Sequence, residues 1–178
     1  GAVDSLKVST ATNSGTQLLA TTLATEGGSL TIDAPRGAVL EGKVYAQGGN
    51  STAAAGSLKL NVLPNSTSDS SNDSLRPSSY QIALQAHSDG VTSGLTLADR
   101  SHVQVGDTYG DVVLSSSWLD KAGFADISLS AADAIVAQSA ATLSAVRSLS
   151  LSAPVFSLVG LGANDTVTLA APKVVFGN

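Results

Sequence analysis

The side chains of this sequence that come closest to a catalytic set lie between residues 99 and 111. Polysaccharide-cleaving sites need clustered carboxylates with a basic partner, and glycoside hydrolysis needs a pair of acids. If this segment crosses one turn of a coiled chain, a histidine and several carboxylates share a face. The alternative, which we favour, is that the two later acids serve glycine-rich turns and the histidine faces solvent. The residues concerned are Asp99, Arg100, Ser101, His102, Asp107 and Asp111.

Three other sets of polar residues are candidates for a ligand-binding or catalytic role. His87 stands next to Ser88, Asp89 and Gly90 and is interpreted as the neighbour of a turn. A serine, histidine and acid can be chosen anywhere in a serine-rich chain, and no nucleophile signature supports such a triad. The calcium-binding Gly-Gly-x-Gly-x-Asp repeat does not occur, which leaves only Asp89-Gly90 and Asn164-Asp165 as oxygen ligands, or as ordinary turn residues. We therefore expect no catalytic, cofactor-binding or metal site and predict that the chain is not an enzyme.

Two surface patterns have both a functional and a trivial explanation. Asn-x-Ser/Thr glycosylation sequons begin at four positions, although a Ser/Thr-rich chain produces them by chance. A threonine row of the kind that binds ice could start at Thr166 and Thr168, but the other repeats offer Ser128, Ser150 and Thr31 instead. The four sequons begin at Asn50, Asn65, Asn72 and Asn164.

Composition limits the class of protein. The chain has 178 residues, of which 43% are hydrophobic, 13% charged and 4% aromatic, and it has no Cys and no Met. Globular domains carry about 25% charged residues, so Ser and Thr must supply much of the polar surface. A net charge of −5 disfavours nucleic acid or an anionic membrane as a partner. No apolar stretch approaches the roughly 20 residues of a membrane span. The missing initiator Met suggests a piece of a longer or processed protein.

Short alternating segments recur along the chain, among them residues 44–46 and 95–97, and this alternation predicts β-strands. Residues 149–154 (LSLSAP) return as 167–172 (VTLAAP), 18 positions later, and 30–35 (LTIDAP) has the same form. Residues 28–32 and 56–60 match at an offset of 28, and the step from Ile127 to Leu149 is 22. Such periods are typical of solenoids. Residues 131–146 are alanine-rich enough for a helix, but their pattern fits strands equally well and we keep them as strands.

These repeats predict an all-β parallel solenoid with coils of about 18–28 residues. Copies of each strand would pair at about 4.8 Å and pile their inward side chains into columns. We predict that Pro154 and Pro172 stack at one corner, because proline cannot donate to the strand ladder. A β-sandwich is the alternative. The predicted columns place Leu149 over Val167, Leu151 over Leu169 and Ala153 over Ala171.

We expect residues 1–178 to form one solenoid segment with a single long surface loop at 64–79. That stretch holds one large apolar residue between its bounding prolines, so it cannot bury enough surface to order itself. A flexible insertion is the simpler interpretation, and a receptor-binding excursion is the alternative.

The sequence resembles the filamentous haemagglutinin-like exoproteins of two-partner secretion systems. A leucine-rich stretch leads into Gly123-Phe124, an alternating strand at 127–129 and the LSLSAP unit at 149–154, and the closing unit spans 167–176. The resemblance is clearest over 112–178, and 27–60 supports it more weakly. It implies a right-handed parallel β-helix that is exported through an outer-membrane transporter and displayed as a secreted or cell-surface adhesin segment. The segment would contribute to adhesion or project a distal binding or toxin domain.

Three classes of function therefore stay open. The structural or adhesive segment is favoured, a specific receptor- or glycan-binding module is second, and a polysaccharide-degrading β-helix enzyme is third. A cut solenoid also exposes unpaired strand edges, and residues 174–176 look like an uncapped last strand. We therefore predict that the isolated chain associates end to end or carries a distorted terminal coil.

Overall fold

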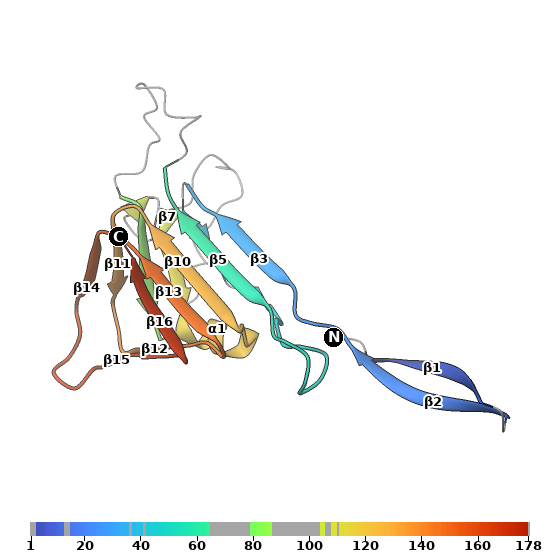
Figure 1. Ribbon diagram of the computed structural model, residues 1–178. Coiled ribbons are helices and arrows are strands. Elements are labelled where there is room, and N and C mark those ends of the chain that lie inside the picture. The colour runs from blue at the N-terminus through green and yellow to red at the C-terminus, as the bar shows by residue number, and fades with distance from the viewer. Residues whose placement is uncertain are drawn as a thin grey trace.

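Figure 1 shows the computed structural model of the chain, which consists mainly of β-strands. It describes residues 3–12, 15–35, 37–40, 42–64, 79–86, 104–105, 108–109 and 111–177. One helix, α1 (Ser116–Ala122), occurs within these ranges. The strands are β1 (Val3–Thr12), β2 (Gly15–Ala24), β3 (Ser29–Asp33), β4 (Ala38–Val39), β5 (Ser57–Val62), β6 (Gln81–Gln85), β7 (Gln104–Val105), β8 (Thr108–Tyr109), β9 (Val112–Ser115), β10 (Asp126–Ala131), β11 (Ala134–Ala137), β12 (Ala141–Ser144), β13 (Ser148–Ser152), β14 (Val155–Leu158), β15 (Val167–Ala170) and β16 (Lys173–Gly177).

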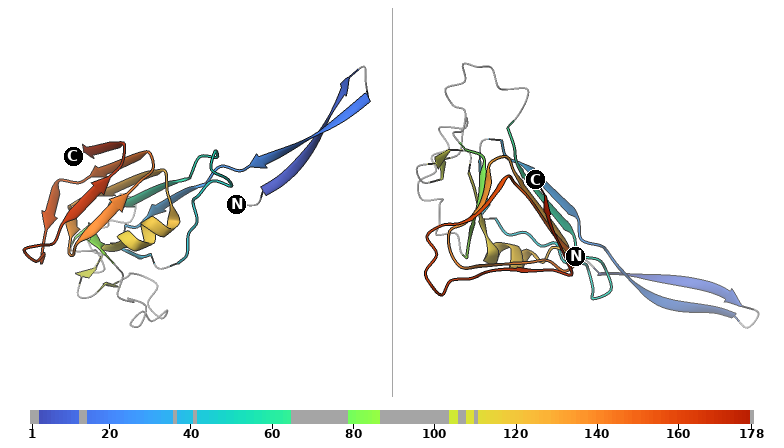
Figure 2. Two further views of the ribbon diagram at one scale, coloured as in Figure 1. Left: turned by 90° about the horizontal axis from the view of Figure 1, so that it is seen from below. Right: turned by 60° about the vertical axis from the view of Figure 1, so that its left-hand side comes forward.

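Three sets of parallel strands make up the body of the protein. The first sheet has the strand order β16-β13-β10-β5-β3, and the second has the order β14-β11-β6-β9-β4. A third set contains the parallel pair β12 and β15. From β10 onward the chain visits the first, second and third sets in turn and then repeats that order. Seen along the stack, these strands follow the sides of a triangle (Figure 2).

Alternation in the first sheet separates an apolar inside from a polar outside. In β10 and β13 every second residue is buried, as expected for strands with one face in the core. Register places Ile127 level with Leu58 and Leu149, so these side chains form one inward column. A second column runs through Leu60, Leu129 and Leu151, all at most 2% exposed. The core is thus built from residues that recur at matching places on successive strands.

The other two sides complete this core. Ile82 of β6 pairs in register with Ile135 of β11, and Leu143 of β12 with Leu169 of β15. The second sheet differs from the first because some residues on its outward face are buried as well, among them Ala83 and Val136. The central outward positions of β6, β9 and β11 are therefore apolar, namely Ala83, Val113 and Val136, and polar residues such as Gln81 and Gln85 stand only at the strand ends.

The predicted columns at an offset of 18 are wrong. Leu149 lies between Ile127 and Val174 in the first sheet, whereas Val167 pairs with Ala141 in the third set. Leu151 and Ala153 are likewise not stacked on Leu169 and Ala171, which lie on or directly after β15. The two similar hexapeptides occupy two different sides of the molecule. Each hexapeptide forms an alternating strand and then a corner. Both sides of the molecule need apolar residues that point inward and a residue that ends the strand, so the two sequences are similar without being stacked.

The two prolines consequently lie at different corners. Pro154 stands between β13 and β14, where the chain passes from the first sheet to the second. Pro172 stands between β15 and β16, where it passes from the third set back to the first. The prediction that they stack at one edge is wrong, and parallel stacking depends on other residue pairs.

The two longer offsets are confirmed. Ser29 pairs with Ser57, 28 positions later, and Ile127 pairs with Leu149, 22 positions later. Both pairings are parallel, which contradicts the β-sandwich alternative for these strands because sandwiches are built from antiparallel sheets. Residues 131–146 contribute β11 and β12 and no helix, as predicted.

Several features were not predicted. β1 and β2 form an antiparallel hairpin that extends away from the body (Figure 1). β9 inserts between β4 and β6, although it follows β6 in the chain. Residues 44–46, a predicted strand, are irregular. The predicted strand at 95–97 and most of the predicted loop at 64–79, namely 65–78, lie outside the described residues.

Helix α1 has sequence signals that the strand-based analysis overlooked. Ser115 occupies the N-cap position, and Gly123 ends the helix with φ 68°, the left-handed conformation that glycine adopts most readily. The backbone N–H of Gly123 donates to the Leu119 carbonyl at 3.1 Å. A serine before and a glycine after a seven-residue run are ordinary helix boundaries. Leu119 is fully buried, and α1 packs against β12 and covers the core there.

Three backbone segments cross closely around Gly27 and Gly56. The Gly56 N–H donates to the Ala46 carbonyl at 2.6 Å, and the Gly27 N–H donates to the Ala54 carbonyl at 2.8 Å. A Cβ on Gly56 would overlap the carbonyl oxygen of Gly28, and one on Gly27 would overlap the carbonyl oxygen of Ala46. The obstacles are main-chain atoms, so no side-chain rotation can make room.

Gly56→Ala should therefore destabilise the protein, whereas Gly28→Ala should not. Overpacking typically costs about 1–3 kcal/mol, and we expect the upper half of that range because backbone must move. Gly28 has open space around its Cβ position, which makes it a matched control. Urea unfolding of both variants measures the difference. Equal free energies of unfolding for the two would contradict this close crossing.

Leu129→Ala should remove part of a continuous aliphatic column. Truncating a buried Leu costs about 2–5 kcal/mol, and Leu129 is 0% exposed. Leu158→Ala is the matched control, because Leu158 is 66% exposed and should lose less than about 1 kcal/mol. A large loss at Leu158 with a small one at Leu129 would place the core elsewhere.

Candidate functional site

Asp111 is the one member of the 99–111 set that the structure describes. Asp99, Arg100, Ser101, His102 and Asp107 lie outside the described residues. Asp111 is 9% exposed and precedes β9. Its carboxylate accepts a hydrogen bond from the Ser79 hydroxyl at 3.0 Å and another from the backbone N–H of Gln81. These bonds attach the segment before β6 to the start of β9, which is a structural role.

A second carboxylate fixes the same corner. The Asp133 side chain accepts from the backbone N–H of Tyr80 at 2.7 Å. Burial raises the pKa of Asp111 above its ordinary value, and the negative charge of Asp133 adds to that rise. The hydrogen bonds from Ser79 and Gln81 act in the opposite direction and lower the pKa. The two acids therefore organise residues 79–81, and the described part of the chain offers them no basic partner at this corner.

The other proposed ligands are likewise turn residues or lie outside the described ranges. His87, Asp89 and Gly90 belong to the latter group. The Asp165 carboxylate accepts from the backbone N–H of Gly162 at 2.8 Å, and the Asp165 N–H donates back to the Gly162 carbonyl at 3.0 Å. This acid closes a turn before β15. Among the described residues no group of three or more His, Asp or Glu side chains is placed to hold a metal ion.

Two of the four sequons can be placed. Asn50 is exposed, and its side-chain oxygen accepts from the Thr52 N–H, the Thr52 hydroxyl and the Ala53 N–H at 2.8–2.9 Å. Asn164 is exposed in the turn before β15. Asn65 and Asn72 lie outside the described residues.

The proposed hydroxyl row is divided between two sides of the molecule. Thr168 pairs with Thr142 in the third set, and Thr166 precedes that strand. Ser128 and Ser150 are neighbours in the first sheet. Thr31 aligns with the same row there, but Lys59 lies between it and Ser128. A single continuous threonine array is therefore wrong.

The outer face of the first sheet carries short, mutually bonded polar side chains. The Ser57 hydroxyl donates to the Ser29 hydroxyl at 3.1 Å, and the Asn61 amide donates to the Asp33 carboxylate at 2.6 Å. Each bond joins residues on adjacent strands. The outward positions of this sheet align in three rows: Ser29, Ser57, Asp126, Ser148 and Lys173; Thr31, Lys59, Ser128, Ser150 and Val175; Asp33, Asn61, Ser130, Ser152 and Gly177.

An ion pair lies beside the first of these rows, at its middle residue, Asp126. The Arg147 guanidinium contacts both carboxylate oxygens of Asp126, with Nε at 2.9 Å from Oδ1, and the Ser148 hydroxyl donates to Oδ1 at 2.6 Å. The hydrogen bond from Arg147 is the main cause of a lowered pKa at Asp126, and the Ser148 bond adds to it. Asp126 thereby ties the start of β10 to the start of β13.

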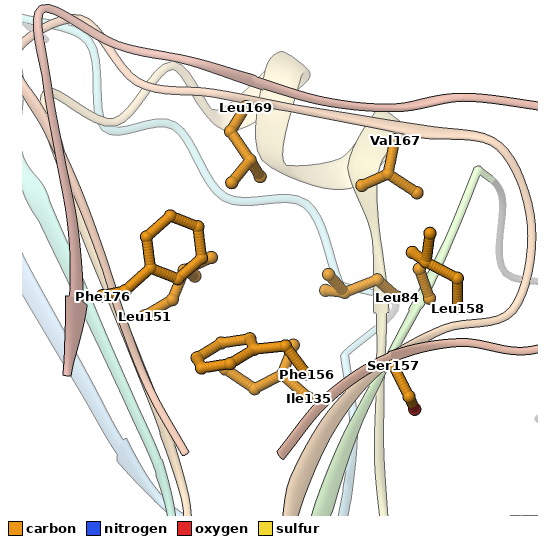
Figure 3. A pocket seen from close by; sticks show the side chains of 10 residues that line it. Leu84, Ile135, Leu151, Phe156, Ser157, Leu158, Val167, Leu169 and Phe176 are labelled. Atoms are coloured by element: carbon orange, nitrogen blue, oxygen red, sulfur yellow. The ribbon is translucent and has the colours of Figure 1, made fainter. Parts of the chain in front are cut away.

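An apolar opening lies at the last strands of the described chain, β14, β15 and β16. A cavity of about 270 Å³ is lined by side chains from all three sets of strands, including Ile135, Leu151 and Leu169. Figure 3 shows these side chains converging, with Phe156 and Phe176 among them. The two rings meet edge to face with centroids 5.2 Å apart. Phe156 is 42% and Phe176 59% exposed, so this end of the core is open to solvent. The exposure of residues 174–176 was expected from the sequence, whereas the exposure of β14 was not.

Comparison with family models, with curated proteins and with solved structures finds no match for this chain. Within the described residues no helix is long and apolar enough to cross a membrane. The described residues offer three features that bear on function: the stacked parallel strands, the polar outer face of the first sheet and the open apolar end.

The two perturbed acids predict opposite pH effects on stability. Because the pKa of Asp126 is lowered, its ionised carboxylate stabilises the folded state fully at pH values above the ordinary pKa of 3.8. This stabilisation is lost as the pH falls through the folded-state pKa. The raised pKa of Asp111 means that the folded state loses stability as the pH rises from 3.8 through the folded-state pKa. As the pH rises, the free energy of unfolding of Asp126→Asn should therefore decrease relative to that of the native protein. The free energy of unfolding of Asp111→Asn should increase relative to it.

Urea unfolding of the native protein and both variants between acid and neutral pH measures these trends. The comparison uses differences between each variant and the native chain at the same pH, so other titrating groups cancel. Parallel curves for all three proteins would show that neither carboxylate has the environment described here.

Proposed function

We propose that this chain is a non-catalytic structural segment of a rod-like, surface-exposed exoprotein of the filamentous haemagglutinin-like class. The proposal includes a right-handed parallel β-helix as its architecture. Its main support is the succession of β10 to β16, in which strands of three sets recur in the same order and each pairs in parallel with its predecessor.

Stacked coils suit a spacer or shaft. In a solenoid each repeat contacts mainly its neighbours, so length can be added without redesigning a central core. The columns through Leu58, Ile127 and Leu149 give such a core its continuity. The hydroxyl and amide rows on the first sheet keep the outside polar in a chain with only 13% charged residues. A segment of this kind can hold a distal binding or toxin domain away from the cell.

Export through a two-partner outer-membrane transporter accompanies this proposal. The sequence has no Cys, so no disulfide has to be reduced or reformed when the chain crosses a membrane unfolded. Secretion or display at the bacterial surface follows from the same class assignment.

A carbohydrate-binding role is the second candidate, and the outer face of the first sheet favours it. Ser128, Ser150, Ser130 and Ser152 form a compact square of hydroxyl-bearing side chains on adjacent strands. Hydroxyls both donate and accept hydrogen bonds, as glycan hydroxyls do. Contact of this face with a cell-surface glycan would make the segment adhesive itself.

Two assays on the purified chain test the proposal. Incubation with acidic and neutral polysaccharides should release no more reducing ends or unsaturated sugars than the heat-unfolded chain releases. Cleavage that Asp111→Asn abolishes, with the fold retained, would overturn the non-catalytic assignment in favour of a polysaccharide-degrading enzyme.

Binding to whole cells and to immobilised glycans separates a spacer from an adhesive segment. Replacing Ser128 and Ser150 by Arg should leave a pure spacer unchanged, and should reduce cell retention at least several-fold if this face is adhesive. Replacing Thr142 and Thr168 by Arg is the matched control, because that pair lies on adjacent strands of the third set.

A further inference from the structure

The second sheet has a buried apolar stripe on its outer face. Ala83 of β6, Val113 of β9 and Val136 of β11 are in register with one another, and we call these three residues the outer stripe. Their sequence neighbours Ile82 and Ile135 belong to the central core, whereas the outer stripe does not. Yet Ala83 is 3%, Val113 7% and Val136 8% exposed. A segment outside the triangle of strands must therefore cover the stripe.

Outward residues on the other two sides of the molecule are open to solvent. Ser128 and Ser150 on the first sheet are half-buried, and Lys59 and Thr142 are exposed. Ser128 has a paired strand on each side, as Ala83 does. Pairing within a sheet therefore does not by itself account for the burial of the outer stripe.

The strand order of the second sheet indicates which segment passes this face. β6 and β9 are adjacent and parallel, and β9 lies on the side of β6 toward β4. Neighbouring parallel strands need a crossover connection that returns along the sheet from the end of one strand to the start of the other. Residues 86–111 make this connection. The inner face is already filled by core residues, including Ile82 and Leu114.

The handedness of parallel connections selects the outer face as well. From β11 to β14 the chain passes through the third and first sets, on the inner side of the second sheet, and advances one strand (Figure 2). From β6 to β9 it moves one strand in the opposite direction. Connections that step in opposite directions have the same hand only if they pass on opposite faces. Because such connections are right-handed in about 98% of cases, residues 86–111 are expected on the outer face.

Part of this connection is described, and it lies on the expected side. The antiparallel pair of β7 and β8 stands outside the triangle of strands, beside the second sheet (Figure 2). The sequence of the connection also supplies apolar residues that suit the outer stripe, among them Val91, Leu95 and Leu97.

We propose that the connection of residues 86–111 docks on the outer face of the second sheet and completes a second, smaller apolar core over the outer stripe. The occupant of this face is a segment of the same chain, so the stripe is not a surface for an external partner. The coils stay stacked beneath it, because β5 and β10 pair directly. The proposal depends on strand order and burial, and it holds whether or not the chain is part of an exoprotein.

Thiol labelling in this cysteine-free chain tests whether the stripe is covered. Val136→Cys places a single thiol in the outer stripe, and Ser150→Cys places one on the open face of the first sheet. Reaction with iodoacetamide, followed by mass spectrometry, gives the two rates. Val136→Cys should react on the order of tenfold more slowly, because a covered side chain is reached only when the structure opens locally. Equal rates would overturn the proposal.

Exchange of the two long segments tests what covers the stripe. In the Val136→Cys chain, replacement of residues 91–105 by a Gly-Ser linker of equal length should raise the labelling rate to nearly that of Ser150→Cys. The same replacement of residues 66–76 is the matched control and should leave the rate unchanged. Circular dichroism confirms that each variant keeps its strands, and Leu95→Ser with Leu97→Ser is the milder change if the linker variant does not fold.

Three further results would contradict the assignment of this segment. A rate that stays slow without the apolar residues of 91–105 would show that they do not cover the stripe. A rate that rises only when 66–76 is replaced would assign the face to that segment. Labelling of Val136→Cys that becomes faster on dilution would assign it to a second copy of the chain.

Discussion

Parallel, in-register pairing of short alternating strands is the constraint on which the rest of the structure depends. Because partners such as Ile127 and Leu149 occupy the same level, each inward residue meets a residue of the same kind on the next strand. Aliphatic side chains then fill the interior, and hydroxyl or amide side chains align outside. This arrangement explains how a chain with 4% aromatic residues can still assemble a continuous core.

Corners and crossings follow from the same constraint. Strands can stay in register only if the chain turns at fixed places, and small or polar residues allow this. Gly56 permits the close approach of the segments around Gly28 and Ala46, while Asp111 and Asp133 bind the backbone of residues 79–81. Asp111, the one described acid of the set that first suggested catalysis, thus accepts hydrogen bonds from the Ser79 hydroxyl and the Gln81 backbone N–H. The polar chemistry of the described residues serves mainly to hold strands level, and the apolar end is where that stacking stops.

The sequence predicted the kind of structure better than its details. Alternation and the offsets of 28 and 22 identified true strand partners, because inward positions must be apolar on every level. The offset of 18 failed because strands on different sides of the molecule face the same local demands, so similarity alone does not reveal which side a strand occupies. The insertion of β9 could not be foreseen, since strand order in a sheet depends on long-range contacts. Exposure of Phe176 was predictable from its terminal strand, but the part played by Phe156 required the register of β11 and β14.

Disulfide trapping in this cysteine-free chain tests the parallel stacking most directly. Adjacent strands bring partner Cα atoms to about 5 Å, within the 4.4–6.8 Å that a disulfide spans. Ser128→Cys with Ser150→Cys places two thiols on the outer face at one level, 22 positions apart. Ser150→Cys with Thr168→Cys is 18 positions apart but lies on different sides. Mild oxidation should close the first pair within one chain and leave the second open; a closed second pair with an open first pair would contradict the stacking described here.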